Sequence, residues 1–159
     1  MMMFWVSGIG IMITRRDLLL IEDDEDDIFI MKRVLKDAGI RNPLRIVRDG
    51  REAIEYLSGT GRFEDRSLYP VPAMVFLDLR LPLVSGHDVL TWIRQRDDLN
   101  STAVAVVTSS DQPEDLRRTR WLGANCYLLK PLTADQLLEM AVVFNWHWLE
   151  CDLFSKQSR

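Results

Sequence analysis

Polar residues that could bind a cation or a phosphoryl group follow four short apolar runs of the sequence. Glu22 and Asp23 follow the first run, Asp78 and Thr108 close two later runs, and Lys130 follows the last. Because ligands of an open parallel sheet bind outside the carboxyl ends of its strands, we expect these side chains to converge on one rim. Three carboxylates at close range repel one another, so the arrangement favours a divalent cation between them.

The same residue types suggest phosphoryl chemistry. Mg²⁺ suits a site of one or two carboxylates that keeps positions open for water and a phosphate oxygen. An aspartate can attack phosphorus and hold it as an acyl phosphate, while Mg²⁺ and a lysine neutralise the phosphoryl oxygens. We therefore assign Asp78 as the nucleophile and Lys130 as the neutralising cation. Thr108 could bond a phosphoryl oxygen and be drawn inward, so the function would be a population shift and not turnover.

The elements that must position these residues alternate between strand and helix. Five apolar runs rich in Leu, Ile and Val predict strands: Leu18–Ile21, Leu44–Val47, Met74–Leu77, Ala103–Val107 and Tyr127–Leu129. The stretches between them have helical spacing, which predicts a parallel sheet covered on both faces with right-handed crossovers. The long connection Ser58 to Pro72 is predicted to be an ordered surface insert, given its Phe63 and Tyr69.

Composition excludes several classes of protein. The 159 residues carry 20 Lys and Arg against 24 Asp and Glu, for a net charge of -4, with no basic stripe for nucleic acid. Cys126 and Cys151 fit a reducing compartment, so we expect a cytoplasmic protein. The first thirteen residues are almost wholly apolar but too short to span a bilayer, so no membrane association is expected. They are either an extension ahead of an alternative start at Met12 or an arm that packs on a partner subunit.

Four motifs in order resemble the receiver domains of two-component response regulators. The motifs are LLLIEDDEDD, VFLDLRLPLVSG, VAVVTSSD and GANCYLLKPL, and the match covers about residues 17 to 148. The separations of 30 residues from Asp78 to Thr108 and 22 from Thr108 to Lys130 are those expected of the family. The resemblance implies a flavodoxin-like, doubly wound α/β fold with five parallel strands in the order 2-1-3-4-5, in a single domain. Residues 1–16 would then be an extension and residues 149–159 a C-terminal helix extension or tail.

The resemblance also implies the ligands of the metal. Mg²⁺ would be bound by Asp23, Asp78 and the backbone carbonyl of Arg80. Glu22 would contribute through water, and it replaces the Asp found in many members of the family. The remaining acids of the run, 24–27, are interpreted as a solvated face in which Asp26 or Asp27 favours the amino end of the first helix.

Further implications of the resemblance concern phosphorylation and the switch. Asp78 would be phosphorylated by a histidine kinase, and Lys130 would bond the phosphate next to a cis peptide bond with Pro131. Tyr127 would be the rotamer switch coupled to Thr108. Arg80 and Ser110 occupy positions that tune water access in relatives. The chain would be a phosphoacceptor switch and not an enzyme in the usual sense.

The insert before the third strand and the Trp-rich end resemble a narrower group, the small stand-alone regulators associated with bacterial phytochromes. The predicted last helix has two apolar stripes, one containing Trp148 and the other Trp146, and these two residues lie about 200° apart around a helix axis. We expect one stripe to face the core and the other a second copy, which would make a homodimer through the C-terminal helix region. The alternative is that residues 149–159 fold back over the second stripe.

The expected partners follow from the absence of a DNA-binding or enzymatic module after the receiver. Output would pass through protein contacts, with a phytochrome-type histidine kinase upstream and a histidine phosphotransfer protein or another kinase downstream.

A haloacid-dehalogenase-type phosphohydrolase also uses a strand-end Asp with Mg²⁺, but it places a second Asp two residues later, where this sequence has Arg80. A receiver-like scaffold that has lost phosphorylation is the third hypothesis.

Overall fold

The computed structural model describes the backbone of residues 2–6, 9–13 and 16–151, and the side chains of residues 16–151. The central sheet has five parallel strands: β3 (Leu18–Ile21), β4 (Leu44–Val47), β5 (Met74–Leu77), β6 (Ala103–Thr108) and β7 (Cys126–Leu129). The helices are α1 (Glu25–Asp37), α2 (Gly50–Ser58), α3 (Gly86–Arg94), α4 (Pro113–Trp121) and α5 (Ala134–Val143). Short 3-10 helices lie at η1 (Gly61–Phe63) and η2 (Asp97–Leu99).

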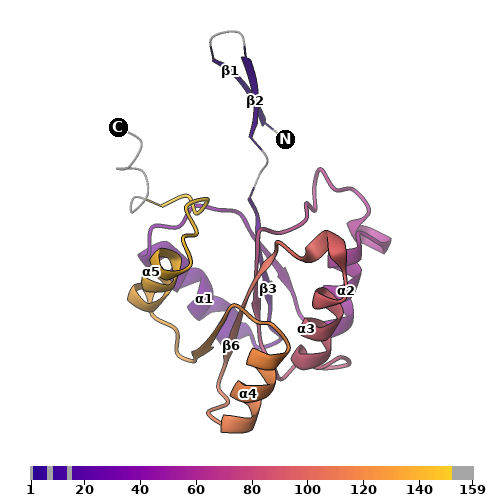
Figure 1. Cartoon of the computed structure of the whole chain (residues 1–159), viewed down its shortest axis with the longest axis vertical. Helices are drawn as coiled ribbons and strands as arrows, with labels where there is room; N and C mark the ends of the chain where they lie inside the picture. Colours follow the sequence, from indigo (N-terminus) through magenta and orange to yellow (C-terminus); the bar gives the residue numbers. More distant parts are fainter. Residues whose placement is uncertain (1, 7–8, 14–15, 152–159) are drawn as a thin grey trace.

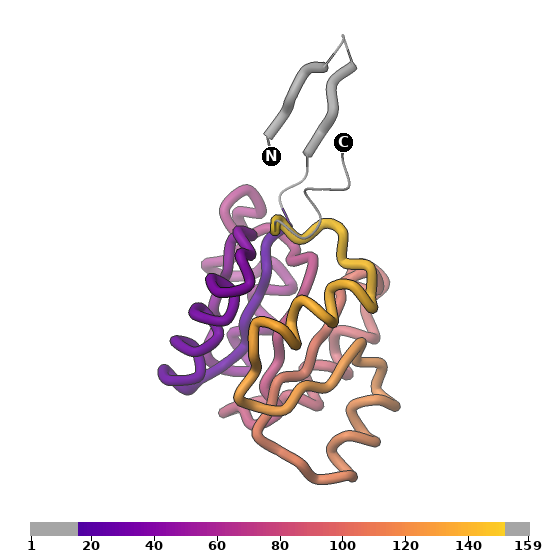
Figure 2. The backbone as a smooth tube through the Cα atoms, turned by 90° about the vertical axis from the view of Figure 1, so that its left-hand side faces the viewer, coloured from indigo at the N-terminus to yellow at the C-terminus, as the bar shows by residue number. Residues whose placement is uncertain are grey.

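The sheet has the strand order β4-β3-β5-β6-β7, which is 2-1-3-4-5 when counted from β3. This confirms the flavodoxin-like fold expected from the sequence. Helices α1 and α5 cover one face of the sheet and α2 and α3 the other, as Figure 1 shows, while α4 packs beside α3 and β7. Figure 2 views the molecule from the side of α1 and α5, so that this helical layer lies in front.

The apolar strands explain this double covering. Side chains alternate between the two faces of a strand, so a strand that is apolar at every position needs cover on both sides. In β3, Leu18 and Leu20 join the core beneath α1 and α5, whereas Leu19 and Ile21 join the core beneath α2 and α3. All four are buried.

The connection from Ser58 to Pro72 is an ordered surface insert, as predicted. Phe63 is buried, and its ring packs against those of Tyr56 and Tyr69 at centroid distances of 5.0 and 5.2 Å. The Arg66 guanidinium donates to the backbone carbonyls of Tyr56 and Leu57, both at 2.7 Å. These contacts fasten the insert to the end of α2.

The C-terminal segment corrects the prediction of a long two-sided helix. Helix α5 ends at Val143, and Asn145 has a φ of 52° in the left-handed region. The Trp146 N–H bonds the Ala141 carbonyl and the Asn145 N–H bonds the Val142 carbonyl, a Schellman arrangement that terminates a helix. The expectation that the two tryptophans face opposite ways is therefore wrong, because it assumed that the helix continued.

After this turn the chain folds back over the core. Trp146, Leu149 and Cys151 are buried in the cluster beneath α1 and α5, and Trp148 packs against that cluster. The rings of Trp146 and Trp148 lie 6.5 Å apart. This segment covers part of the second stripe within the chain, since Trp146 is buried, but Val142 and Val143 on α5 remain exposed and residues 152–159 lie outside the described residues.

The first thirteen residues include a two-stranded antiparallel sheet of β1 (Met2–Val6) and β2 (Ile9–Ile13). Their side chains lie outside the described residues, so neither interpretation of this segment is tested. In the described part of the chain, no helix is long and apolar enough to cross a membrane.

Candidate functional site

The parallel register brings the predicted site residues to one rim. Ile21 pairs with Leu77 at the ends of β3 and β5, so Glu22 and Asp78 follow side by side. Thr108 closes β6, and the Lys130 N–H donates to the Thr108 carbonyl at 2.9 Å. The rim is therefore formed by four strand ends that are far apart in sequence.

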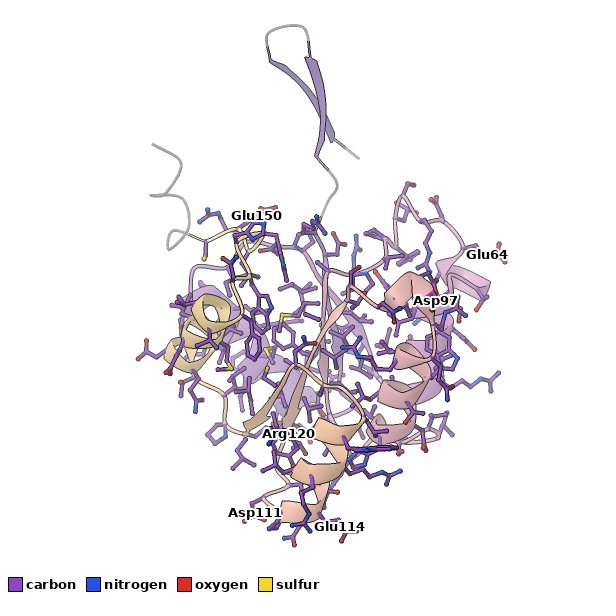
Figure 3. The ribbon with its side chains drawn as sticks, viewed as in Figure 1. Glu64, Asp97, Asp111, Glu114, Arg120 and Glu150 are labelled. Atoms are coloured by element: carbon purple, nitrogen blue, oxygen red, sulfur yellow. The ribbon has the colours of Figure 1, made fainter. Side chains whose placement is uncertain are left out.

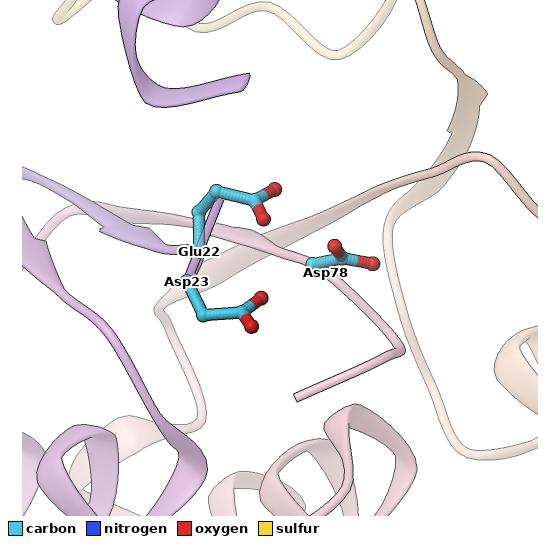
Figure 4. Close-up of side chains that lie close together, drawn as sticks. All are labelled: Glu22, Asp23 and Asp78. Atoms are coloured by element: carbon cyan, nitrogen blue, oxygen red, sulfur yellow. The ribbon is translucent and has the colours of Figure 1, made fainter. Parts of the chain in front are cut away.

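Three carboxylates form the centre of the rim. One oxygen each from Glu22, Asp23 and Asp78 lies within 4.8 Å of the others. Figure 4 shows the three side chains close together at the ends of their strands. Glu22 and Asp78 are buried at 3% and 7% exposure, whereas Asp23 is exposed, so the group is open to solvent on one side.

Lys130 is the cation that this rim supplies. Its Nζ donates to Glu22 Oε2 at 2.7 Å, to Asp27 Oδ2 at 2.7 Å and to Asp78 Oδ2 at 3.0 Å. The Lys130–Pro131 peptide bond is cis, as expected from the sequence. Lys130 thus links the first turn of α1 to the carboxyl ends of β3 and β5.

Burial and neighbouring charges at the rim shift the pKa values of Glu22 and Lys130. Burial raises the pKa of Glu22 to about 7, and the nearby charge of Asp78 adds to that increase, although the Lys130 hydrogen bond opposes it. Burial alone would lower the pKa of Lys130, but the hydrogen bonds that its ammonium donates to three carboxylates outweigh this effect and raise that pKa above its ordinary value. Lys130 is therefore charged at neutral pH, and the rim has more negative than positive charge.

Asp78 is held by one hydrogen bond at its backbone and one at its side chain. Its N–H donates to the Ile21 carbonyl at 3.1 Å, and its Oδ1 accepts from the Arg80 N–H at 3.2 Å. Helix α3 begins at Gly86, where an added Cβ would lie 2.2 Å from the Asp78 carbonyl oxygen. Only glycine permits this approach, which brings the amino end of α3 against the strand end that carries Asp78.

A cavity of about 290 Å³ opens beside the rim, under α1. Its polar side contains Glu22, Asp27, Asp78 and Lys130, and its other side is formed by apolar residues that include Ile30. The rim is thus reachable by a molecule larger than water.

Thr108 and Tyr127 are linked through one residue of the loop after β6. Thr108 is fully buried, and its hydroxyl oxygen accepts from the Ser110 N–H at 3.3 Å. The Tyr127 hydroxyl donates to the Ser110 carbonyl at 2.8 Å, while the Ser110 hydroxyl donates to Asp115 Oδ2 at 2.5 Å. A displacement of Thr108 would therefore reach both Tyr127 and the first turn of α4.

Asp27 is the site residue that the sequence analysis did not find. Asp24, Asp26 and Asp27 do begin α1, with Asp24 as the N-cap, but Asp27 is not a solvated acid because it bonds Lys130. The spacing of the acids gives no signal for this, because Asp23 and the N-cap Asp24 precede α1 and so share no helical face with Asp27. His87 is buried, and its ring bonds the Thr119 hydroxyl at 3.1 Å.

The family whose model matches residues 18–142 is the response regulator receiver domain. The chain is 36% identical over 133 residues to the response regulator Rcp1 of Synechocystis, covering 84% of this chain and 88% of Rcp1. It is 35% identical over 132 residues to the probable methanogenesis regulatory protein FilR2 of Methanothrix harundinacea, covering 83% of each.

Solved structures give the same likeness. The Mn²⁺-bound form of Rcp1 matches with a TM-score of 0.70 at 36% identity, covering 85% of this chain and 95% of Rcp1. The bacteriophytochrome response regulator AtBRR matches with a TM-score of 0.72 at 35% identity, covering 81% of this chain and 91% of AtBRR. The predicted resemblance to the phytochrome-associated regulators is therefore confirmed.

Proposed function

This chain belongs to the response regulator receiver family, and on that premise we propose that it accepts a phosphoryl group on Asp78 from a histidine kinase. The observation that carries the proposal is the grouping of Asp78 with two further carboxylates and the Lys130 ammonium at one open rim. Members of this family act as signalling switches in two-component systems and not as classical enzymes.

The transfer would proceed by in-line displacement at phosphorus. An Asp78 carboxylate oxygen attacks the phosphorus of a phosphohistidine, the P–N bond to the donor imidazole breaks, and the imidazole leaves with a proton from solvent. The product is an acyl phosphate on Asp78. Lys130, already 3.0 Å from Asp78 Oδ2, would then donate to a phosphoryl oxygen and neutralise part of its charge.

The donor set of the rim fits a hard divalent cation. Asp23, Asp78, the Arg80 carbonyl and, through water, Glu22 would hold Mg²⁺, since oxygen ligands and an open side are what this ion prefers. When bound, Mg²⁺ would neutralise negative charge on the phosphoryl oxygens. The Mn²⁺-bound form of Rcp1 supports an ion of this kind.

The switch would respond through Thr108 and Tyr127. Bonding of the Thr108 hydroxyl to a phosphoryl oxygen would withdraw it from the Ser110 N–H, and the carbonyl of the same Ser110 accepts from Tyr127. The released Tyr127 would change the surface formed by α4, β7 and α5. Output would then be a change in protein contacts.

We extend the proposal to partners and organisation. The receiver would span residues 17–148, between an extension at 1–16 and a tail at 149–159. A phytochrome-type histidine kinase would act upstream and a histidine phosphotransfer protein downstream, in the cytoplasm. Val142 and Val143 are exposed on α5 and support a homodimer through the C-terminal region.

Labelling with a small phosphodonor tests this function. Wild-type protein is incubated with Mg²⁺ and acetyl phosphate beside an Asp78→Asn variant. We expect a hydroxylamine-labile phosphoryl group on wild type alone. No labelling of wild type would favour the scaffold hypothesis, and sustained release of phosphate from many phosphomonoesters would favour the hydrolase.

A further inference from the structure

The hydrogen-bonding capacity of Lys130 is fully used by three different carboxylates. An ammonium group has three N–H donors and no acceptor. Glu22 and Asp27 accept at 2.7 Å and Asp78 at 3.0 Å, so each donor faces one acid. The side chain of Lys130 is only 15% exposed, so the acids and not water determine where the ammonium lies.

Two of these three acids have another role under the proposed function, on which this inference rests. Glu22 and Asp78 belong to the group of close carboxylates at the rim, and Asp27 does not. Phosphorylation would convert Asp78 into an acyl phosphate, and Glu22 would help to hold the cation through water in place of its bond to the ammonium. Asp27 is therefore the one partner of Lys130 that both states leave in place.

The backbone holds Asp27 where it can do this. Asp27 is the third residue of α1, and its N–H donates to Oδ1 of the N-cap Asp24 at 3.0 Å. The same oxygen accepts from Asp26 at 2.9 Å, so both residues lie in one capped turn. Asp26 is exposed and makes none of the three Lys130 bonds, which makes it a matched control.

We propose that Asp27 is a positioning residue for phosphoryl transfer, which holds the Lys130 ammonium beside Asp78 before and after the phosphoryl group arrives. Asp27 touches Lys130 and not the reacting atoms. Without it, none of the three carboxylate bonds that orient the ammonium remains once the site is phosphorylated. The lysine side chain then has to be ordered during the reaction, which slows transfer.

The negative charge of Asp27 is expected to slow phosphorylation, whereas its hydrogen bond to Lys130 is expected to speed it. Its carboxylate repels an anionic phosphodonor, so removing the charge alone would speed phosphorylation. Asp27→Asn and Asp27→Ala separate the two effects, because Asn keeps an oxygen acceptor for Lys130 and Ala does not. If position dominates, Asn rescues the loss caused by Ala; if charge dominates, the two variants behave alike.

The experiment compares wild type with Asp27→Ala, Asp27→Asn and Asp26→Ala, each checked for folding by urea unfolding. It measures the second-order rate constant of labelling by acetyl phosphate at saturating Mg²⁺, and the affinity for beryllofluoride, which mimics the phosphoryl group. We expect Asp27→Ala to be slower and to bind more weakly by about tenfold, with Asp27→Asn within about threefold of wild type. Asp26→Ala and the affinity for Mg²⁺ alone should stay at wild-type values.

Two results would overturn the inference: Asp27→Ala as fast as Asp26→Ala, or Asp27→Asn matching Asp27→Ala in either direction. Failure of the proposed function looks different. In that case wild-type protein itself is not labelled, or Asp78→Asn is labelled equally.

Discussion

The two ends of the central sheet bury charge in opposite ways. At the amino end, the fully buried Asp17 carboxylate accepts from the Arg45 guanidinium at 2.9 Å. At the carboxyl end, Lys130 alone faces three carboxylates, and Asp23 lies next to them. Figure 3 shows the separation: Glu150 lies at the amino end, and Asp111 and Glu114 lie at the other.

This difference separates a structural charge from a functional one. A buried charge without a partner is destabilising, so stability alone favours the balanced arrangement of the amino end. An excess of buried acids persists where a ligand supplies the missing positive charge. We therefore expect substitutions at the amino end to lower stability and leave phosphorylation intact, and substitutions at the carboxyl end to do the reverse.

The largest effect is expected from Arg45→Met. This change leaves the Asp17 carboxylate buried without its guanidinium, and we expect the free energy of unfolding to fall by about 3 kcal/mol. Urea unfolding measures it. Arg48→Met is the control, because its ion pair with Glu25 is exposed and should contribute less than about 0.5 kcal/mol. Equal effects of the two variants would contradict the account.

Asn42→Ala tests the second structural device at the amino end. The Asn42 side chain accepts from the Glu150 N–H at 2.6 Å and donates to the Arg16 carbonyl at 3.0 Å. Its loss leaves these partly buried backbone groups without their partner, and we expect a destabilisation of about 2 kcal/mol, with faster amide exchange at Glu150. Asn100→Ala, at an exposed position, is the control. Unchanged exchange at Glu150 would show that Asn42 does not hold the C-terminal segment.

Asp78→Asn is expected to raise the free energy of unfolding, whereas the two substitutions at the amino end lower it. Removing one of several like charges at the rim should raise the free energy of unfolding of the metal-free protein by about 1 kcal/mol while abolishing phosphorylation. The same urea titration measures this change. A loss of stability comparable to that of Arg45→Met would mean that both ends of the sheet are structural.

The smallest effect is a pH dependence at the rim. Burial raises the pKa of Glu22 from 4.5 to about 7, so between these two values the folded protein holds more protons than the unfolded chain. Stability from this group is fully present below the ordinary pKa and is lost as pH rises from there through about 7. Burial lowers the pKa of His87 and gives the opposite slope, so a Glu22→Gln variant is needed to isolate the term. Equal slopes in wild type and Glu22→Gln would contradict this assignment.

The sequence predicted the fold and most of the rim because both depend on strands. Each predicted strand is present within one residue of its expected bounds, since runs of branched apolar residues bounded by polar ones have few alternatives. Parallel strands then bring their carboxyl ends together whatever the details of packing. For this reason Glu22, Asp78 and Lys130 could be grouped without coordinates.

Two features that the sequence did not predict depend on which acid α1 turns toward the rim and on the backbone angle of one residue. Asp27 joins the rim only because α1 turns that acid, and not Asp26, toward Lys130. The helix before Trp146 ends because Asn145 adopts a left-handed conformation, which Asn tolerates better than most residues. The periodicity of the tryptophans gave no sign of this, although Asn at that position is a known helix terminator.

The central claim is that the excess acid at the carboxyl end is a site for a phosphoryl group on Asp78. The most direct measurement is to label the protein with acetyl phosphate, reduce the acyl phosphate with borohydride and locate the modified residue by fragmentation mass spectrometry. We predict modification of Asp78 alone, dependent on Mg²⁺. Modification of a different residue, or equal modification after Mg²⁺ is removed by a chelator, would contradict the account.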